Sequence, residues 1–293
     1  MTDSRGPIGI FDSGLGGLSV LRAVRALLPH EDVVYVADSF HAPYGERDDD
    51  FIVDRSLAIG EWLLGQDAKA IVVACNTATA QAVHLLRTVT PLPVVGVEPG
   101  LKPAAALSTS RVAGVLATAA TLRSDKFKRL LAGHQANCRF LCQPGHGLVE
   151  AIERGHTDTP ELIALLESYL APMLAEGADT LVLGCTHYPF IDAAIRHIVG
   201  DRMILVDTSA AIAQQLARLL TDKHALVAST TTTTTTTTNV TQGVPLGRVR
   251  LCTTGDAKPL AHVAYTLLGL DEPVEILSIP SRRTLGDASA ASA

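Results

Sequence analysis

Two segments of this 293-residue chain carry nearly the same pattern: AKAIVVACNTAT begins at Ala68 and ADTLVLGCTHYP begins at Ala178. In each segment a run of apolar residues ends in a cysteine, Cys75 or Cys185, which small polar residues follow. Such a run is typical of a buried strand. Ligands of open α/β sheets bind just beyond the carboxyl ends of the strands. The pattern therefore predicts two similar halves, each of which places one thiol at a ligand crevice.

Strand-like runs alternate with helical patterns along most of the chain. Apolar runs predict strands at residues 7–13, 32–38, 70–75, 93–98, 111–118, 137–142, 180–185 and 203–208. Helical patterns lie between most of them, for example at 18–28, 51–65 and 159–176. This alternation is typical of parallel sheets with right-handed crossovers. We therefore expect an α/β fold of two pseudosymmetric domains, with mainly parallel sheets flanked by helices and an active site in the cleft between the domains.

The composition is that of a globular protein with ample apolar material for a core. Hydrophobic residues make up 47% of the chain and charged residues 18%, and the net charge is −6. No apolar run approaches the roughly 20 residues of a membrane span, and the N-terminus carries charge and enters an expected strand at once, unlike a secretory signal. An odd number of cysteines, five, is typical of reduced thiols. We therefore expect a cytoplasmic protein that binds neither nucleic acid nor membranes.

One segment departs from the alternation of strands and helices. Thr230–Thr238 is an unbroken threonine run. Because a threonine homopolymer has nothing large to bury, we expect a mobile surface loop there and assign it no function. The C-terminal residues 286–293 are expected to be disordered.

The glycine-rich stretch Asp12–Ser19, between an expected strand and helix, allows three interpretations. Gly14 and Gly16 match the start of a dinucleotide-binding fingerprint and Asp38 ends the next strand, but Ser19 stands where the third glycine belongs. Alternatively, the glycines bring the backbone close to a ligand, and the helix start offers N–H groups to a carboxylate. The third interpretation is a tight turn capped by one of its first two residues. The local sequence leaves all three open.

The two equivalent cysteines are candidates for acid/base chemistry. A lone cysteine at a strand end is most often a small buried hydrophobe. Here both cysteines are followed by hydrogen-bonding residues: Asn76, Thr77, Thr186 and His187. A free thiol has a pKa of about 8.5, close enough to neutrality to exchange protons. We therefore expect Cys75 and Cys185 to transfer protons, with Asp12 and His187 as the groups that tune or relay them.

Two further groups of residues have chemistry that could give them a role. Cys138, Cys142 and His146 are regularly spaced, but no fourth ligand accompanies them, so we expect no metal. The segment 41–47, HAPYGER, is a turn in which Tyr44 is placed to line the cleft, because the loop leaves the same sheet edge as the first cysteine.

Five motifs follow one another along the chain. They are DSGLGGLSV (12–20), APYGER (42–47), VVACNTAT (72–79), LGCTHYP (183–189) and CTTGD (252–256). In this order they resemble the cofactor-independent glutamate racemases, over nearly the whole chain. The resemblance implies two pseudosymmetric α/β domains, 1–98 with 209–293 and 99–208, the second inserted into the first. It also implies that L- and D-glutamate are interconverted without a cofactor, which supplies D-glutamate for peptidoglycan synthesis.

The resemblance also implies roles for individual residues. Cys75 and Cys185 would be the proton donors and acceptors on opposite faces of the substrate Cα, acting on D- and L-glutamate respectively. Asp12 would support Cys75, and His187 would support Cys185. Residues implied to bind or lie near the substrate are Asp12, Ser13, Tyr44, Gly45, Asn76, Thr77, Thr118, Thr121, Glu153, Thr186 and His187. Family members often form homodimers, although no segment here marks an interface.

Three other functions remain as alternatives at this point. The first is a racemase for aspartate or another amino acid. The second is a hydrolase in which Cys75 is the nucleophile and His187 the base, which leaves Cys185 without a role. The third is a solute-binding protein with two α/β lobes around a cleft, a fold that does not by itself separate binding from catalysis.

Few residues precede the first expected strand, whereas some family members carry an N-terminal extension associated with activation by a cell-wall precursor. We therefore predict that this precursor leaves the racemisation rate unchanged when it is added to an assay. Strong stimulation would contradict this expectation.

Overall fold

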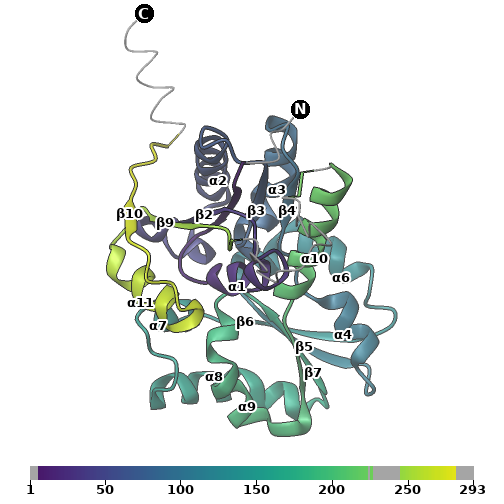
Figure 1. Ribbon diagram of the computed structural model, residues 1–293. Coiled ribbons are helices and arrows are strands. Elements are labelled where there is room, and N and C mark those ends of the chain that lie inside the picture. Colours follow the sequence, from purple (N-terminus) through teal and green to yellow (C-terminus); the bar gives the residue numbers. More distant parts are fainter. Residues whose placement is uncertain (1–5, 224, 227–244, 282–293) are drawn as a thin grey trace, which may run out of the picture.

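The structure is a computed structural model that describes residues 6–223, 225–226 and 245–281, and it contains two parallel sheets (Figure 1). The threonine run 230–238 and the C-terminal residues 286–293 lie outside the described residues. Every strand pairing in the described part of the chain is parallel. The α/β fold with mainly parallel sheets is thereby confirmed.

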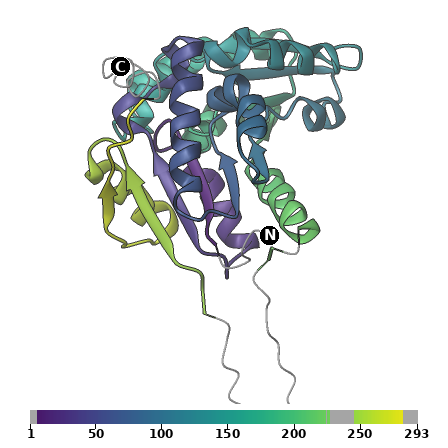
Figure 2. The same ribbon diagram turned by 90° about the horizontal axis from the view of Figure 1, so that it is seen from above.

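The first sheet has the strand order β10-β9-β2-β1-β3-β4. Its strands are β1 (Ile8–Asp12), β2 (Val33–Ala37), β3 (Ala70–Val73), β4 (Val94–Gly96), β9 (Val249–Thr253) and β10 (Val274–Ile276). The second sheet has the order β6-β5-β7-β8. Its strands are β5 (Val112–Ala117), β6 (Arg139–Pro144), β7 (Thr180–Gly184) and β8 (Ile204–Val206). In Figure 2, the yellow-green β9 lies beside the purple β2.

The strand orders make the internal repeat visible. The stretch β2-β1-β3-β4 of the first sheet has the same order as β6-β5-β7-β8 of the second. In this correspondence β3, which precedes Cys75, is equivalent to β7, which precedes Cys185. The predicted pseudosymmetry is therefore confirmed. Each cysteine follows the strand that pairs with the first strand of its own half, β3 with β1 and β7 with β5.

Helices follow most strands. They are α1 (Leu18–Leu27), α2 (Asp49–Leu64), α3 (Asn76–Val89), α4 (Leu101–Leu107), α5 (Ala119–Arg123), α6 (Asp125–Ala132), α7 (Leu148–Glu153), α8 (Pro160–Ala175), α9 (Asp192–Val199), α10 (Ser209–Asp222) and α11 (Ala257–Leu268), with short 3-10 turns η1 (Ser39–His41), η2 (Tyr44–Glu46), η3 (Tyr188–Ile191) and η4 (Gly200–Arg202). Local sequence sets their starts: Thr159 accepts the N–H of Leu162 at 3.3 Å, and Pro160 fits the first turn of α8.

Helices cover both faces of each sheet. Ile8 and Ile10 of β1 pack with α1 and α10, whereas Phe11 packs with α2 and α3. Successive strand residues point to opposite faces, so a strand buried on both faces has a continuous apolar sequence. The second sheet is covered by α7, α8 and α9 on one face and by α4 and α6 on the other. We call each sheet with its helices a lobe.

The chain returns to the first lobe through α10, which follows β8 of the second sheet and packs against α1. The expected domain boundaries, 98/99 and 208/209, fall in the segments between β4 and α4 and between β8 and α10. These boundaries stay a prediction.

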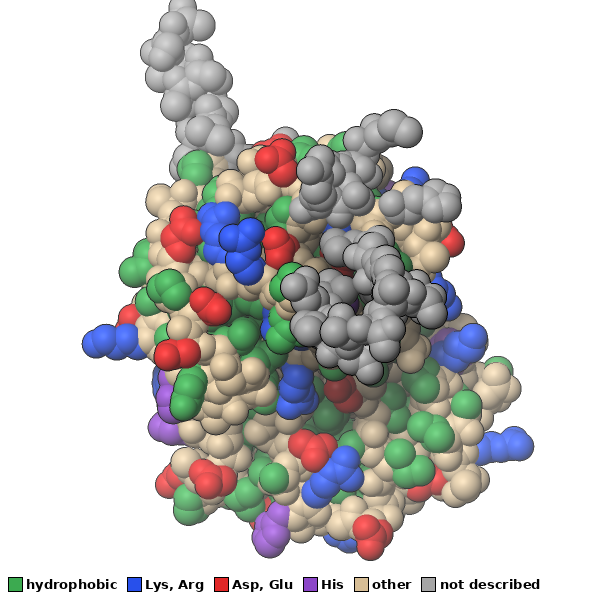
Figure 3. All heavy atoms as spheres, viewed as in Figure 1, with side chains coloured by type: hydrophobic (Ala, Val, Ile, Leu, Met, Phe, Trp, Pro, Cys, Tyr) green, Lys and Arg blue, Asp and Glu red, His purple; other side chains and the backbone are tan. Residues whose placement is uncertain are grey.

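Within the described residues, no helix has the length and apolarity needed to cross a membrane. On the face seen in Figure 3, acidic and basic side chains are interspersed over the described surface.

We predict that Leu216→Ala, on α10 in the same core cluster as residues of α1, lowers the free energy of unfolding by about 2–5 kcal/mol, because it leaves a cavity in the core. Leu216 is fully buried. Urea unfolding measures the change. The control is Leu107→Ala on α4, where the side chain is 47% exposed. This control should change stability by less than about 0.5 kcal/mol. An equal loss of unfolding free energy in the two variants would mean that packing of α10 against α1 does not stabilise the first lobe.

Candidate active site

Both cysteines lie just beyond the carboxyl ends of equivalent strands, and both are buried. Cys75 is the N-cap of α3, where its Sγ accepts the N–H of Ala78 at 3.5 Å. Cys185 directly follows β7. The loop that follows β1 contacts the surroundings of both: Oγ of Ser13 lies 3.6 Å from Sγ of Cys75, and the backbone N of Gly16 lies 3.2 Å from Nε2 of His187, two residues after Cys185. The fold therefore brings the two thiols, which are far apart in sequence, to one site.

Cys75 is surrounded by hydrogen-bonding groups from the end of β1. Its thiol donates to Oγ of Ser13 at 3.6 Å. The Asp12 carboxylate accepts the N–H groups of Ser13 and Gly17, each at 2.7 Å. Burial raises the pKa of Asp12, and burial followed by the Asp12 charge raises the pKa of Cys75. Cys75 therefore holds its proton in the neutral range.

Cys185 has a different partner. Nδ1 of His187 lies 3.6 Å from its Sγ, and Nε2 of the same ring lies 2.5 Å from Oε1 of Glu153. Burial alone would lower the pKa of His187, but its hydrogen bonds to Cys185 and Glu153 raise the pKa well above the ordinary value. His187 therefore holds its proton, and it places an N–H donor and a positive charge beside the Cys185 sulfur.

The glycine-rich loop before α1 brings the first lobe against this imidazole–carboxylate pair. Oε1 of Glu153 accepts the N–H of Leu15 at 2.7 Å, and the backbone N of Gly16 lies 3.2 Å from Nε2 of His187. A Cβ at Gly16 would lie 2.7 Å from Cε1 of His187, and one at Gly14 would lie 2.9 Å from the carboxyl carbon of Glu153. Glycines are thus needed here because the backbone approaches side chains of the other lobe closely, and not because it approaches a ligand.

This arrangement bears most directly on the dinucleotide-binding interpretation of the loop. The space against its backbone is filled by the other lobe, which argues against the dinucleotide interpretation. Ser19, which stands at the third glycine position, donates its hydroxyl to the carbonyl oxygens of Gly16 and Thr186, at 2.8 and 3.0 Å. Asp38 is engaged in an ion pair with Arg55. The loop therefore joins the two lobes.

A chain of threonines makes a second connection between the lobes. The hydroxyls of Thr77, on α3, and Thr118, at the end of β5, lie 2.9 Å apart. The Thr118 hydroxyl donates to that of Thr121 at 2.9 Å. Gly45 of the turn η2 lies against Thr118, since a Cβ there would be 3.1 Å from that of the threonine. All four residues were expected near the substrate.

Asn76 is the residue whose surroundings most clearly point to a ligand. It follows Cys75 and is 3% exposed, and neither polar atom of its side chain has a hydrogen-bond partner in the described part of the protein. A buried polar group without a partner costs about 1–3 kcal/mol. Asn76 and Thr121 also line a cavity of about 420 Å³.

Tyr44 is placed differently from the other expected site residues. It is buried, and its hydroxyl donates to Oδ2 of Asp38 at 2.5 Å. A ligand contact from this residue would therefore come from its backbone. Sequence reasoning assigned no part to Arg55, which pairs with the same aspartate. The one sequence feature that could have indicated this pair is the position of Asp38, because a carboxylate directly after a buried strand needs a partner.

Known proteins resemble this chain over most of its length. Residues 18–216 match the family model described as Asp/Glu/Hydantoin racemase. A glutamate racemase from Ralstonia nicotianae is 56% identical over 92% of this chain and 91% of its own. The structure of a glutamate racemase isoform from Bacillus anthracis matches with a TM-score of 0.82 and 28% identity, covering 95% of this chain and 100% of that one.

The structure of glutamate racemase from Francisella tularensis in complex with D-glutamate matches with a TM-score of 0.78 and 28% identity, covering 94% of this chain and 98% of that one. Sequence and structure thus agree over nearly the entire chain. The protein belongs to the Asp/Glu/Hydantoin racemase family.

Proposed function

We propose that this protein is a glutamate racemase that interconverts L- and D-glutamate with its own two cysteines and no cofactor. The observation that carries the proposal is the pair of buried thiols at equivalent strand ends, each with a different polar partner: the Ser13 hydroxyl for Cys75 and the His187 imidazole for Cys185. The high identity to glutamate racemases supports the choice of substrate. In a bacterial cytoplasm this activity supplies D-glutamate for peptidoglycan.

Racemisation of L-glutamate starts with Cys185 deprotonated and Cys75 protonated. Cys185, as thiolate beside the protonated His187, removes the α-proton of L-glutamate, and Cys75 gives its own proton to the opposite face. The products are D-glutamate, a Cys185 thiol and a Cys75 thiolate, so protons and charge balance. The reverse reaction starts from that second state. Asp12 supports Cys75 in the exchange, and a pair of this kind titrates as a unit.

The carbanion formed between the two steps needs stabilisation, because its charge spreads onto the α-carboxylate. Donors that are already oriented stabilise such charge without reorganising. Asn76 supports this role because its buried amide has no protein partner within the described residues. Thr77 and Thr186 flank the two cysteines and complete the amino-acid end of the site. Burial of both thiols excludes water, which protects the carbanion from stray protons.

The side-chain carboxylate of glutamate is assigned to Ser13 and to the Tyr44–Gly45 turn. Thr118 and Thr121 join that turn to the α3 side of the site, and Glu153 fixes His187. The hydrolase alternative does not fit, because His187 contacts the Cys185 sulfur and not that of Cys75. A homodimer stays a prediction.

The function is tested by incubating the purified protein, dialysed against a chelator, with L-glutamate and following optical rotation. Loss of rotation, with D-glutamate recovered, is the expected result. Turnover of aspartate in place of glutamate would keep the fold and the two-cysteine chemistry and correct the substrate. Inactivity toward both amino acids would refute the proposal.

We predict that Cys75→Ser and Cys185→Ser each reduce racemisation by at least about 10³-fold, because a serine hydroxyl is too weak an acid to replace a thiol in proton transfer. Elimination from a β-chloro analogue of glutamate needs only one base, so each variant should retain it for one enantiomer. Chiral analysis of the consumed analogue identifies the enantiomer. Near-normal racemisation in either variant would exclude the two-base scheme.

We predict that Gly16→Ala lowers kcat/KM by about 100-fold, because the added methyl displaces His187 and a misplacement of about 1 Å is enough for such a loss. The control is Gly133→Ala at the end of α6, where the nearest heavy atom to a new Cβ is 3.4 Å away. That control should keep wild-type kinetics. Unchanged activity in Gly16→Ala would show that the contact between loop and imidazole is dispensable.

A further inference from the structure

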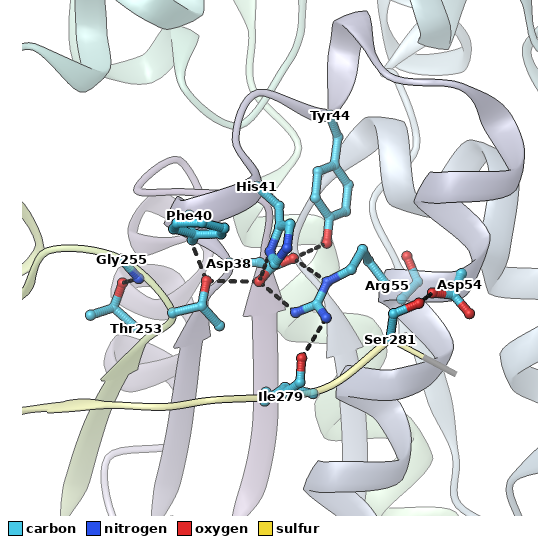
Figure 4. Close-up of polar contacts among 12 residues, drawn as sticks. Asp38, Phe40, His41, Tyr44, Asp54, Arg55, Thr253, Gly255, Ile279 and Ser281 are labelled. Atoms are coloured by element: carbon cyan, nitrogen blue, oxygen red, sulfur yellow. Dashed lines mark hydrogen bonds and ion pairs between the residues drawn. The ribbon is translucent and has the colours of Figure 1, made fainter. Parts of the chain in front are cut away.

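A buried carboxylate outside the acid/base machinery collects donors from distant parts of the chain (Figure 4). Asp38, directly after β2, is fully buried. Its Oδ2 accepts from Nε of Arg55 at 3.0 Å, and its Oδ1 accepts from Nη2 of the same guanidinium at 2.8 Å. This two-point geometry fixes the plane of the carboxylate as well as its position.

Three more side chains complete the cluster. The Tyr44 hydroxyl donates to Oδ2, and the hydroxyl of Thr254 donates to Oδ1 at 2.8 Å. Nδ1 of His41 lies 3.0 Å from Oδ1. Burial alone would raise the pKa of Asp38, but hydrogen bonds from His41 and Arg55 hold the pKa well below its ordinary value. The carboxylate is therefore charged and fully engaged.

The cluster also reaches the C-terminal part of the described chain. Nη1 of Arg55 donates to the carbonyl oxygen of Ile279 at 2.6 Å, as Figure 4 shows. Thr254 belongs to the CTTGD motif, which has no part in the proton transfers proposed above. Asp38 and Arg55 thus join the end of β2, α2, the end of β9 and the segment after β10.

What the cluster holds in place is the turn η2. Tyr44 is anchored through its hydroxyl, and the next residue, Gly45, lies against Thr118. Thr118 bonds to Thr77, two residues after the Cys75 thiol. Asp38 therefore holds the turn on one side through Tyr44, and on the other side Gly45 of the turn contacts Thr118 in the site.

We propose that Asp38 and Arg55 are positioning residues that set the place of the Tyr44–Gly45 turn, and with it the affinity for the side-chain carboxylate of the substrate. They touch neither cysteine and act only through the turn. The inference rests on the proposed function, which assigns that carboxylate to this turn. The side-chain carboxylate of glutamate keeps its charge throughout the reaction, so the turn binds the ground state and the transition state equally well. Displacing the turn should therefore raise KM more than it lowers kcat.

The test is steady-state kinetics of Arg55→Lys and Thr254→Val. Lysine keeps the charge but lacks the two-point contact, and valine removes one hydroxyl with little change of shape. We expect KM for glutamate to rise about tenfold in Arg55→Lys and about threefold in Thr254→Val, with kcat within about twofold of wild type. Thr254→Val keeps the test valid if Arg55→Lys does not fold.

A matched control separates positioning from general stability. Asp179, directly before β7, accepts from Oγ of Ser108 at 2.6 Å and from the N–H groups of Thr109 and Ser110. Asp179→Asn should lower the melting temperature without changing KM. A KM within about twofold of wild type in every test variant that folds overturns the proposal, whatever the melting temperatures. An equal rise of KM in Asp179→Asn also overturns it.

The proposed function and this inference fail in different ways. If the wild-type protein does not turn over glutamate, the function itself is wrong. If the wild type is active and the test variants keep its KM, only the positioning role is wrong.

Discussion

The site depends on a contact between the lobes that only glycine permits. The loop before α1 places the backbone of Leu15 and Gly16 against Glu153 and His187 of the second lobe. That contact orients the imidazole beside Cys185 while the start of the same loop, at Asp12, holds the groups around Cys75. One short segment thereby couples the two halves of the acid/base pair, and side-chain bulk at its closest points would separate them.

The two halves are alike in backbone but unlike in electrostatics. Pseudosymmetry supplies equivalent strand ends, and each delivers a thiol. The thiol of Cys75 lies beside a carboxylate, whose charge opposes a second negative charge, whereas Cys185 lies beside an imidazole that keeps its proton. This difference is what a proton-in, proton-out reaction needs, because the two groups must begin each turnover in opposite protonation states.

Much of the fold and the location of the site follow from local sequence. The apolar runs before the two cysteines are long enough to identify strands, and their similarity predicts the repeat. The contacts that finish the site are not local. Glu153 meets a backbone N–H 138 residues away, and the Arg55 contact with Ile279 spans 224 residues. The three-residue β10, with Glu275 and Ile276 exposed, has too little apolar pattern to be predicted.

The most direct test of two opposed protein acids is isotope exchange at early times in D₂O. Starting from L-glutamate, the D-glutamate first formed should carry one α-deuterium while the remaining L-glutamate keeps its α-proton. The same asymmetry should appear from D-glutamate, since each cysteine returns the proton it removed to the face it came from. Deuterium entering the remaining substrate as fast as the product would contradict the mechanism, because it would indicate a single base that exchanges with solvent and serves both faces.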